Sequence, residues 1–453
     1  MQYNEAKTYL DSFINYEFDL NKVQPNSFKI DRVKDLLALL DNPQNNYKII
    51  HVAGSKGKGS ICAITASILK EAGFTVGLYT SPHIYSFLER IRVLDRAETV
   101  KRGALFADVI NEKDLCDILE DIKPIIEEYC IKKDIDRLSV FEVFTVIALV
   151  HFRERKVDLA VLETGLGGRL DATNAVESLV AVIAPISLEH TRILGDNIAD
   201  IAREKAAIIK EGTKGVIIAK QEQKALDVIE KRAKEYSIDP LVVGRDIAIE
   251  LVSQEISGQS FNVTINEGKY LDLKMRLLGK HQAHNAAAAI GVVQALKKFG
   301  FAISAEAVYK GIQECFWPGR FEIISEEPMI ILDGAHNEAS CAILAETAIT
   351  LLPKKRIVLI LGFSKDKDKA AICRQLGKAV NKVVFTKAAH PRSAQITAEE
   401  LKGYFPDKES FVTSNVEEAL SLAKEKAGLN GVILVSGSLF VVSEARKIVG
   451  EQK

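Results

Sequence analysis

The stretch Gly54-Ser55-Lys56-Gly57-Lys58-Gly59-Ser60 decides the fold of this chain. It follows the short apolar run Ile49-Ile50-His51-Val52, and apolar residues then recur at three- and four-residue steps from Ile61 to Leu69. Gly73 follows this pattern and is a residue typical of helix C-termini. The sequence therefore predicts a strand, a glycine-rich turn and a helix, in that order.

The glycine-rich turn has the composition of a phosphate-binding loop. Glycines allow backbone N–H groups to approach and surround an oxyanion, and the N-terminus of the following helix adds partial positive charge. Lys58 is placed to neutralise nucleotide phosphates, and the Ser60 hydroxyl to contact phosphate or Mg²⁺. Gly59 separates these two residues, which are adjacent in the usual P-loop. We predict nucleotide binding here; the alternative is a plain glycine turn with solvent-exposed lysines.

Strand and helix patterns on both sides of this loop predict an α/β protein. Five short apolar runs near helical patterns predict a mainly parallel sheet with helices on both faces: Ile49–Val52, Thr75–Tyr79, Leu159–Leu162, Val180–Ala184 and Val216–Ala219. Alternation from Ile247 to Leu278 predicts a small antiparallel sheet. After the break at Pro318-Gly319, a second series of runs begins: Met329–Leu332, Ile357–Leu361, Val383–Phe385 and Val432–Val435. We expect two domains, residues 1–317 and 318–453.

The composition excludes several classes of protein. The chain has 453 residues, of which 47% are hydrophobic, and its 60 Lys+Arg and 61 Asp+Glu leave a formal net charge of −1. This balance argues against wholesale disorder and against a protein that coats nucleic acid or an anionic membrane. The longest apolar runs are shorter than the ~18 residues of a membrane span, and the start lacks a secretory pattern. Six cysteines without a CxxC pair are typical of reduced thiols, so we expect a cytoplasmic protein.

Two residues at predicted strand ends are candidate metal ligands. Glu163 ends the strand Leu159–Leu162, and ligands gather at the carboxyl ends of parallel strands, so this carboxylate is placed to bind Mg²⁺. Taken alone, Glu163 could equally cap a helix or lie on the surface. His190 follows the strand Val180–Ala184, and a lone histidine is more often structural than a ligand.

Many further short motifs occur in order along nearly the whole chain. In the predicted first domain they are Gly54–Ser60, Tyr79–His83, Glu89–Val93, Ser139–Glu142 with Thr145, Glu163–Asn174, Leu188–His190, Lys205–Ile208, and His281-Gln282 with Asn285. From Pro318 onward they are Pro318–Glu322, Leu332–Asn337, His390–Ser393 and Gly437–Phe440. Together these motifs resemble the Mur ligase superfamily and, within it, the folylpolyglutamate synthase/dihydrofolate synthase family.

The resemblance implies a P-loop Mur-ligase-type ATP-binding domain and a smaller Rossmann-like C-terminal α/β domain. It implies an ATP- and Mg²⁺-dependent ligase that joins L-glutamate to dihydropteroate or to a reduced folate. A substrate carboxylate attacks the γ-phosphate to give an acyl phosphate and ADP, and the glutamate amine then displaces phosphate. Because the first step joins two anions, the site must be rich in cations, and a cleft that closes between the domains would keep water from the acyl phosphate. The resemblance also implies a monomer, and the charge balance and short apolar runs predict no nucleic-acid or membrane partner.

The resemblance also implies roles for single residues. The nucleotide-binding residues are Gly54, Gly57, Lys58, Gly59, Ser60, Asn285, Arg320 and Asp333, with Arg320 reaching phosphate from the domain junction. The metal ligands are Ser81, Glu163 and His190. The catalytic set is Lys58, His190, Lys205, Arg320, His336 and Ser438, in which Lys205 resembles a lysine that is carbamylated in many members and the last two lie near the amino-acid site. The pterin or folate side comprises Pro82, His83, Ser139, Val140, Phe141, Glu142 and Arg169.

Structural explanations stay open for several of these residues. Lys205 could be a lysine on a helix surface, Arg320 a linker salt bridge and Asp333 a strand-end cap. His336 could be a packed loop histidine, and Phe141 could belong to the core as easily as stack on a pterin ring. The sequence also departs from the family pattern: Ser55-Lys56 replaces the common Thr-Asn, Glu338 stands where proline is common, and Lys29–Arg32 replaces the usual Gly-Leu-Glu-Arg.

Three other functions stay open at this point. A Mur-type ligase for a cell-wall UDP-sugar precursor usually has an additional N-terminal domain, and only about fifty residues precede the glycine-rich loop. A P-loop kinase would not need a second α/β domain. A non-catalytic nucleotide-dependent switch could lose the metal ligands and keep the fold.

Overall fold

The computed structural model describes residues 1–16, 29–95, 106–266 and 268–451 and separates into two compact units. The first unit comprises Met1–Glu250, Phe261–Leu273 and Ala283–Cys315, and the second comprises Leu251–Ser260, Lys274–Gln282 and Phe316–Lys453. Two short segments near residues 251–282 thus group with the second unit. The domain division at 317/318 stays a prediction.

A seven-stranded sheet organises the first unit, in the order β3-β2-β4-β1-β5-β6-β7. Its strands are β1 Lys48–Ala53, β2 Val76–Tyr79, β3 Ile91–Leu94, β4 Leu159–Glu163, β5 Val180–Ile183, β6 Gly215–Ile218 and β7 Leu241–Val242. Only β3 is antiparallel to its neighbour. The five predicted strands are confirmed, and β3 and β7 extend the sheet at its two edges.

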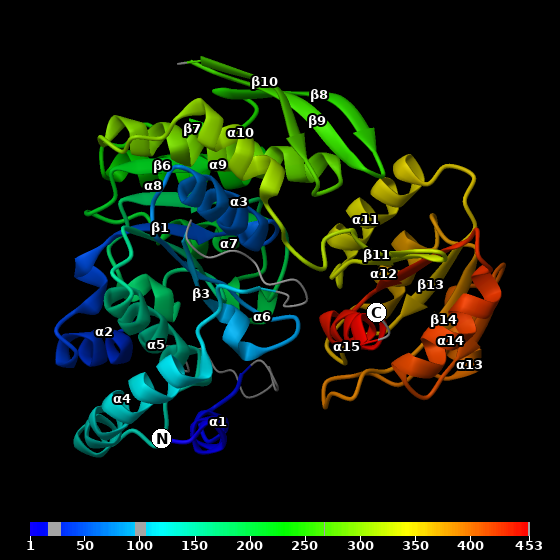
Figure 1. The fold of residues 1–453 in the computed structure, drawn as a ribbon, viewed down its shortest axis with the longest axis horizontal. Helices are drawn as coiled ribbons and strands as arrows, with labels where there is room; N and C mark the ends of the chain where they lie inside the picture. The colour runs from blue at the N-terminus through cyan, green and yellow to red at the C-terminus, as the bar shows by residue number, and fades with distance from the viewer. Residues whose placement is uncertain (17–28, 96–105, 267, 452–453) are drawn as a thin grey trace. The chain divides into compact units, whose positions relative to one another are not determined.

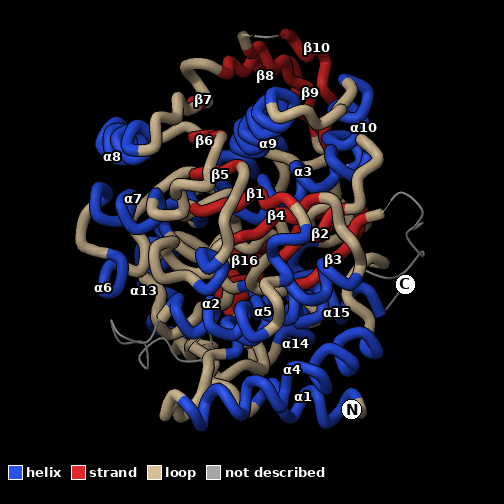
Figure 2. The backbone as a smooth tube through the Cα atoms, turned by 90° about the vertical axis from the view of Figure 1, so that its left-hand side faces the viewer, coloured by secondary structure: helices blue, strands red, loops and turns tan. Residues whose placement is uncertain are grey.

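Helices cover both faces of this sheet. The α-helices between residues 3 and 314 are α1 Tyr3–Asp11, α2 Ile30–Leu39, α3 Lys58–Glu71, α4 Glu112–Lys132, α5 Val140–Glu154, α6 Thr191–Leu194, α7 Ile198–Ala206, α8 Gln223–Glu235, α9 Lys280–Lys298 and α10 Ala305–Glu314. Figure 1 shows α2 and α5 on one side of β1 and α3 and α9 on the other, and Figure 2 shows the same layers from a second direction. The N-cap of α2 predicted at Asn26-Ser27 lies outside the described residues.

Alternate residues of the strands define the two faces. Ile49 and Ala53 of β1 face the side of the sheet whose apolar cores include residues of α2, α5 and α7. On the other face Gly215 lies against Ala295 of α9, so that this helix packs directly on the sheet. Since both faces are covered, the central strands are mostly apolar on both faces, which explains why they appear in the sequence as short apolar runs.

A separate three-stranded sheet has the order β10-β9-β8, with β8 Ile247–Glu255, β9 Gly258–Ile265 and β10 Gly268–Met275. Only two residues separate β8 from β9, and so short a connection joins antiparallel neighbours. The small antiparallel sheet predicted from the alternation in this region is confirmed.

The second unit is built on a six-stranded sheet in the order β11-β12-β16-β13-β14-β15, in which only β11 runs antiparallel to its neighbour. Its strands are β11 Glu322–Glu326, β12 Met329–Leu332, β13 Ile357–Leu361, β14 Lys382–Phe385, β15 Glu409–Val412 and β16 Val432–Ser436. Its helices are α11 Glu338–Leu351, α12 Lys369–Leu376, α13 Ala398–Tyr404, α14 Val416–Ala427 and α15 Leu439–Glu451. One apolar core includes residues of α11, α12 and α13, and a second those of α14 and α15, as expected for a doubly covered α/β sheet. In the part of the chain that the structure describes, no helix is long and apolar enough to cross a membrane.

Candidate active site

The glycine-rich loop connects β1 to the N-terminus of α3 and lies against the end of β5. The backbone N–H groups of Ser55 and Lys56 both donate to the Pro185 carbonyl, at 2.9 and 3.1 Å. Gly57 has a φ of 76°, and a Cβ built on it would lie 2.6 Å from Oδ1 of Asn285. Only glycine fits this position, because the backbone is left-handed and the amide of α9 occupies the space of a side chain.

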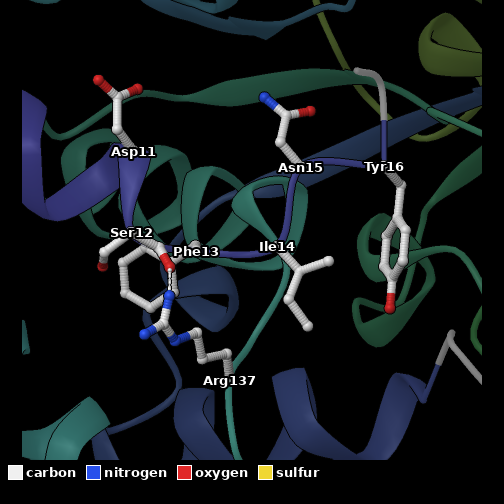
Figure 3. Close-up of a pocket in the computed structure, with 7 residues that line it drawn as sticks. All are labelled: Asp11, Ser12, Phe13, Ile14, Asn15, Tyr16 and Arg137. Atoms are coloured by element: carbon white, nitrogen blue, oxygen red, sulfur yellow. Dashed lines mark hydrogen bonds between the residues drawn. The ribbon is translucent and has the colours of Figure 1, made fainter. Parts of the chain in front are cut away.

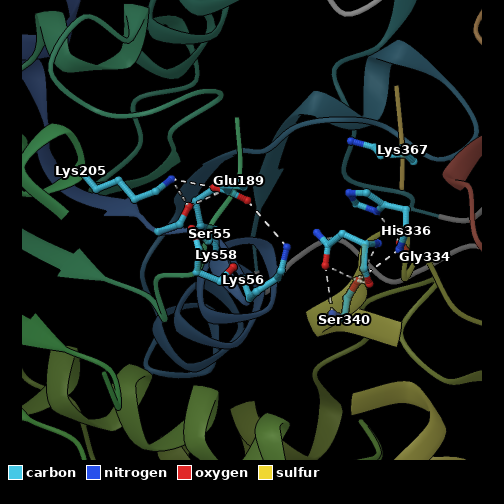
Figure 4. Close-up of polar contacts among 12 residues, drawn as sticks. Ser55, Lys56, Lys58, Glu189, Lys205, Gly334, His336, Ser340 and Lys367 are labelled. Atoms are coloured by element: carbon cyan, nitrogen blue, oxygen red, sulfur yellow. Dashed lines mark hydrogen bonds and ion pairs between the residues drawn. The ribbon is translucent and has the colours of Figure 1, made fainter. Parts of the chain in front are cut away.

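Three lysines and one glutamate gather at this loop (Figure 4). Lys58 Nζ donates to the Gly54 carbonyl at 3.1 Å, and Lys205 Nζ donates to the same oxygen at 2.8 Å. Glu189 accepts from Lys205 Nζ at 2.9 Å through Oε1, and its Oε2 lies 3.7 Å from Lys56 Nζ. The cluster carries two more positive than negative charges, which suits a nucleotide phosphate.

The environment of Lys205 lowers the pKa of its amine. The side chain is almost fully buried. Burial lowers the pKa of Lys205 to about 8, although Glu189 acts in the opposite direction. Burial also opposes the ionisation of Glu189, but Lys205 and the two loop lysines outweigh it and lower its pKa to about 2. Near neutral pH a measurable fraction of Lys205 is therefore the neutral amine, which is the form that CO₂ carbamylates.

Glu163 and Ser81 are brought together at the carboxyl ends of neighbouring strands. Glu163 is the last residue of β4 and is buried, and β4 lies between β1 and β2. Its Oε2 accepts a hydrogen bond of 3.1 Å from the N–H of Ser81, in the loop after β2. His190 lies in the loop after β5, next to Glu189, and has a left-handed backbone with a φ of 46°.

These donors suit a hard cation. Mg²⁺ prefers oxygen ligands and keeps several from water and phosphate, so one carboxylate and serine hydroxyls are a sufficient protein contribution. Within the described ranges no group of three His, Cys, Asp or Glu side chains could hold a metal ion by itself. Glu163 and Ser81 therefore fit Mg²⁺ bound jointly with a nucleotide, and the assignment of His190 as a ligand stays a prediction.

The loop that carries Pro82 and His83 is held by the two residues before β3. The Glu89 carboxylate accepts hydrogen bonds of 2.9–3.0 Å from three consecutive backbone N–H groups, those of residues 84–86. Arg90 Nε donates to Nδ1 of His83 at 3.1 Å. Because Nδ1 accepts this bond, Nε2 of His83 carries the ring proton and is a donor.

The segment Ser139–Glu142 forms the start of α5. Ser139 and Glu142 form a capping box: the serine N–H donates to Glu142 Oε2 at 2.6 Å, and the glutamate N–H donates to Ser139 Oγ at 3.2 Å. The Phe141 ring lies against Gly165, because a Cβ built on this glycine would stand 2.7 Å from the Phe141 Cζ. The centroids of the Phe141 and Tyr79 rings are 5.7 Å apart. This packing holds the loop after β4 close to α5; the roles of these residues and of Val140 toward a substrate stay predictions.

Arg169 and Asp171 occupy the loop after β4. Arg169 is largely exposed and pairs with Glu204 at 2.9 Å. Asp171 is buried and accepts hydrogen bonds from the N–H groups of Leu166 and Thr173, at 2.8 and 3.0 Å. Burial raises the pKa of Asp171 and these hydrogen bonds oppose the rise. The loop is therefore held by a buried carboxylate, while Arg169 faces solvent.

In the second unit, His336 and Ser438 follow the neighbouring parallel strands β12 and β16 and so lie at one edge of the sheet. His336 Nδ1 lies 2.7 Å from the Gly334 carbonyl. Figure 4 draws this contact as a dashed line. Because a carbonyl only accepts, Nδ1 is the donor, and Nε2 is the acceptor nitrogen of the neutral ring. Ser438 Oγ accepts from the N–H of Phe440 at 3.2 Å, at the start of α15.

Asp333 and Arg320 are also neighbours in this unit. Asp333 accepts from the backbone N–H groups of Phe321 and Ala335, each at 2.8 Å, and its burial raises its pKa. Arg320 NH1 donates to the Gly319 carbonyl at 2.9 Å. Asp333 therefore ties the turn that carries Arg320 to the end of β12.

A pocket of about 430 Å³ in the first unit contains none of the predicted site residues (Figure 3). It is lined by Asp11, Ser12, Phe13, Ile14, Asn15, Tyr16 and Arg137. The backbone of Ile14 pairs with that of Leu138 and Val140, at 3.0 and 2.9 Å. The segment around Ile14 is thus hydrogen-bonded to the start of α5.

Comparison with known proteins identifies the family. Residues 132–293 match the model of the Mur ligase middle domain, and residues 319–439 match that of the glutamate ligase domain of Mur ligases. The dihydrofolate synthase/folylpolyglutamate synthase of Bacillus subtilis (strain 168) is 34% identical over 421 residues, 92% of this chain and 94% of the relative. This chain belongs to the dihydrofolate synthase/folylpolyglutamate synthase family.

Solved structures of folylpolyglutamate synthases share the fold over nearly the whole chain. That of Mycobacterium tuberculosis complexed with ADP has a TM-score of 0.87 and 28% identity, covering 99% of this chain and 98% of that chain. A complex described as FPGS-AMPPCP-folate has a TM-score of 0.82 and 28% identity, covering 99% of this chain and all of that one.

Two contributors to the site of this folylpolyglutamate synthase family member were not predicted as site residues. Glu189 stands next to His190, but nothing in the sequence shows that its partner is Lys205, sixteen residues away. Asp171 lies inside a motif quoted above, and only its burial and hydrogen bonds reveal that it holds the loop.

Proposed function

We propose that this chain catalyses the ATP-dependent addition of L-glutamate to dihydropteroate, to reduced folates, or to both. One observation carries the proposal: a lysine-rich phosphate-binding loop and a glutamate ligase domain occur in one chain of the folylpolyglutamate synthase family. The related complexes contain ADP or AMPPCP, and one also contains folate. A cell-wall precursor as substrate and a non-catalytic switch are both less consistent with the loop, the ligase domain and the ligands of these related complexes.

Activation of the carboxylate takes place at the glycine-rich loop. The backbone of Gly54–Ser60 and the N-terminus of α3 bind the phosphates, while Lys58 exchanges its bond with Gly54 for one with phosphate. Asn285, Arg320 and Asp333 are proposed to complete the nucleotide contacts. Glu163 and Ser81 hold Mg²⁺, which supplies additional charge neutralisation when it is bound. His190 is proposed to be a third ligand of this metal ion.

Lys205 is proposed to be carbamylated in the active enzyme. Its buried amine with a lowered pKa is suited to react with CO₂, and the product is an anionic group that can hold a metal ion. Carbamylation forms an N–C bond between Nζ and CO₂, releases one proton and leaves an anionic group, so it removes the ion pair that Lys205 now forms with Glu189 at 2.9 Å. The carboxylate of Glu189 already has a second cation, Lys56, to which it can turn.

The second step uses the edge of the six-stranded sheet. His336 and Ser438 are proposed to bind L-glutamate, and the acceptor nitrogen Nε2 of His336 to take the proton of the attacking amine. The pterin is proposed to contact Pro82, His83 and the segment Ser139–Glu142, with Arg169 near its anionic end. A monomeric state and a cytoplasmic location complete the proposal.

The purified protein tests it directly. It is incubated with ATP, Mg²⁺ and L-glutamate together with dihydropteroate, tetrahydrofolate or a UDP-sugar cell-wall precursor, and phosphate release and the glutamylated product are measured. We expect turnover only with a pterin substrate. Phosphate release that depends on the UDP-sugar would support the cell-wall alternative, and nucleotide binding without any turnover would support a switch.

A further inference from the structure

The turn that carries Arg320 is fixed by two acidic side chains of the second unit. Glu322 Oε2 accepts from the N–H of Gly319 at 2.9 Å, and Asp333 Oδ2 accepts from the N–H of Phe321 at 2.8 Å. The Gly319 carbonyl accepts a third bond of 2.9 Å from the N–H of Gly334. The residues on both sides of Arg320 are thus held, which fixes the backbone from which its side chain extends.

The backbone conformation of the turn shows that these contacts impose it. Phe321 has a φ of 46° and a buried ring. A bulky residue adopts this left-handed conformation only where its surroundings over-determine it, and such strain gathers at functional sites. Phe321 is the residue directly after Arg320, so the strain lies where the direction of the arginine is set.

Glu322 is in turn held by a residue far away in the sequence. Arg446 NH2 donates to Glu322 Oε1 at 2.6 Å, and the two side chains are only 20% and 10% exposed. Within the described residues, Nε of Arg446 is buried and has no hydrogen-bond acceptor. Among the described residues the Arg446 guanidinium is thus paired with Glu322, and Glu322 has one oxygen for Arg446 and one for the backbone of Gly319.

The helix that supplies Arg446 also begins at the proposed amino-acid site. Helix α15 starts at Leu439, directly after Ser438, and packs against β11, whose first residue is Glu322. One rigid element therefore connects Ser438 with the turn of Arg320.

We propose that Glu322 and Arg446 are positioning residues that direct Arg320 toward the nucleotide phosphate. The inference rests on the proposed function, since that is where Arg320 contacts phosphate. Arg446 orients Glu322, Glu322 holds the N–H of Gly319, and the turn presents the guanidinium. Neither residue contacts the nucleotide itself.

The test measures the affinity for AMPPCP with Mg²⁺ by isothermal titration calorimetry. Arg320→Met should weaken binding about tenfold, because a charge-assisted hydrogen bond to phosphate is lost. Arg446→Met and Glu322→Gln should weaken binding about three- to tenfold, and Arg446→Lys should recover part of the loss. As a matched control we use Arg374→Met, because Arg374 also donates from NH2 to a glutamate, Glu338, at 2.6 Å, but on the exposed surface. This control should bind like the wild type.

A double-mutant cycle separates positioning from simple stability. If Arg446 acts through Arg320, Arg446→Met should change affinity less than twofold once Arg320 is already methionine. An equal loss in both backgrounds overturns the inference, as does wild-type affinity in Arg446→Met. Thermal unfolding of every variant identifies any that fails to fold. If Arg446→Met is one of these, Arg446→Lys takes its place in the double-mutant cycle. Failure of the proposed function gives a different result. The variants then show the expected changes in AMPPCP affinity, but the wild-type protein shows no pterin-dependent turnover.

Discussion

Substitution of Gly57 by alanine should separate the two reasons for a glycine in the phosphate-binding loop. The first reason is the backbone, because a φ of 76° costs an alanine about 1–2 kcal/mol. The second is space, because the new Cβ would lie 2.6 Å from Oδ1 of Asn285, where real contacts essentially never fall below 3.0 Å. The amide of Asn285 must therefore move, and with it a proposed nucleotide contact.

Gly73 provides the matched control at the other end of helix α3. Its φ is 96°, and nothing lies within 4 Å of a Cβ built on it. Both Gly57→Ala and Gly73→Ala should lower the free energy of unfolding by about 1–2 kcal/mol. Only Gly57→Ala should also weaken AMPPCP binding, by about tenfold or roughly 1.4 kcal/mol, because one nucleotide contact is displaced.

Calorimetric titration with AMPPCP and urea unfolding measure the two effects separately. In an Asn285→Ala background the space is open, so Gly57→Ala should cause little further loss of affinity. The reasoning is refuted if Gly57→Ala binds AMPPCP as the wild type does, or if Gly73→Ala loses as much affinity as Gly57→Ala.

Three further predictions concern single side chains. Burial lowers the pKa of His151 to about 4. As the pH falls below about 6.5, the imidazole therefore binds a proton in the unfolded chain but stays neutral in the folded one, and the free energy of unfolding decreases toward pH 4. His151→Leu should reduce the loss of unfolding free energy between pH 7.5 and 5.5 by about 1.3 kcal/mol in urea titrations. Lys58→Ala should lower pterin-dependent phosphate release at least about a hundredfold with an unchanged circular dichroism spectrum, because charge neutralisation is lost in the transition state. Lys205→Ala should lose turnover that added short carboxylates partly restore, since they replace a carbamate.

Each of these predictions has an outcome that contradicts it. An unchanged pH dependence in His151→Leu would show that the buried ring is protonated in the folded state as well. Near-wild-type turnover of Lys58→Ala would remove this lysine from the phosphate site. Full activity of Lys205→Ala would exclude a carbamate role.

The local elements of the fold could be predicted because their causes are local. The strand, glycine turn and helix around Gly54–Ser60 follow from apolar spacing and from glycine at positions that need it, and the structure confirms them as β1 and α3. The antiparallel edge strands β3 and β11 were not predicted as strands. Polar residues interrupt both stretches, Arg92 in β3 and Glu322, Ser325 and Glu326 in β11, so neither forms a continuous apolar run, and both become strands by pairing with a neighbour.

Glu163 was predicted from its position at a strand end, whereas Ser81, His336 and Ser438 were predicted from the family resemblance, and strand order explains why they lie where they do. The carboxyl ends of parallel strands meet at one edge, and this places Glu163 beside Ser81 and His336 near Ser438. The partners of Glu189 and Glu322 could not be found in this way. Lys205 reaches Glu189 from a separate helix, and Arg446 reaches Glu322 across 124 residues.

By itself, the sequence determined the α/β class, the phosphate-binding loop and the family, because these depend on residue types at fixed short spacings. Tertiary structure alone decided which charges meet. Burial lowers the pKa of Lys205 to about 8 beside Glu189, and contacts with the end of β12 hold Phe321, next to Arg320, in a left-handed conformation. Both effects arise from the loss of water and the approach of distant segments, and neither is a property of any short stretch of the chain.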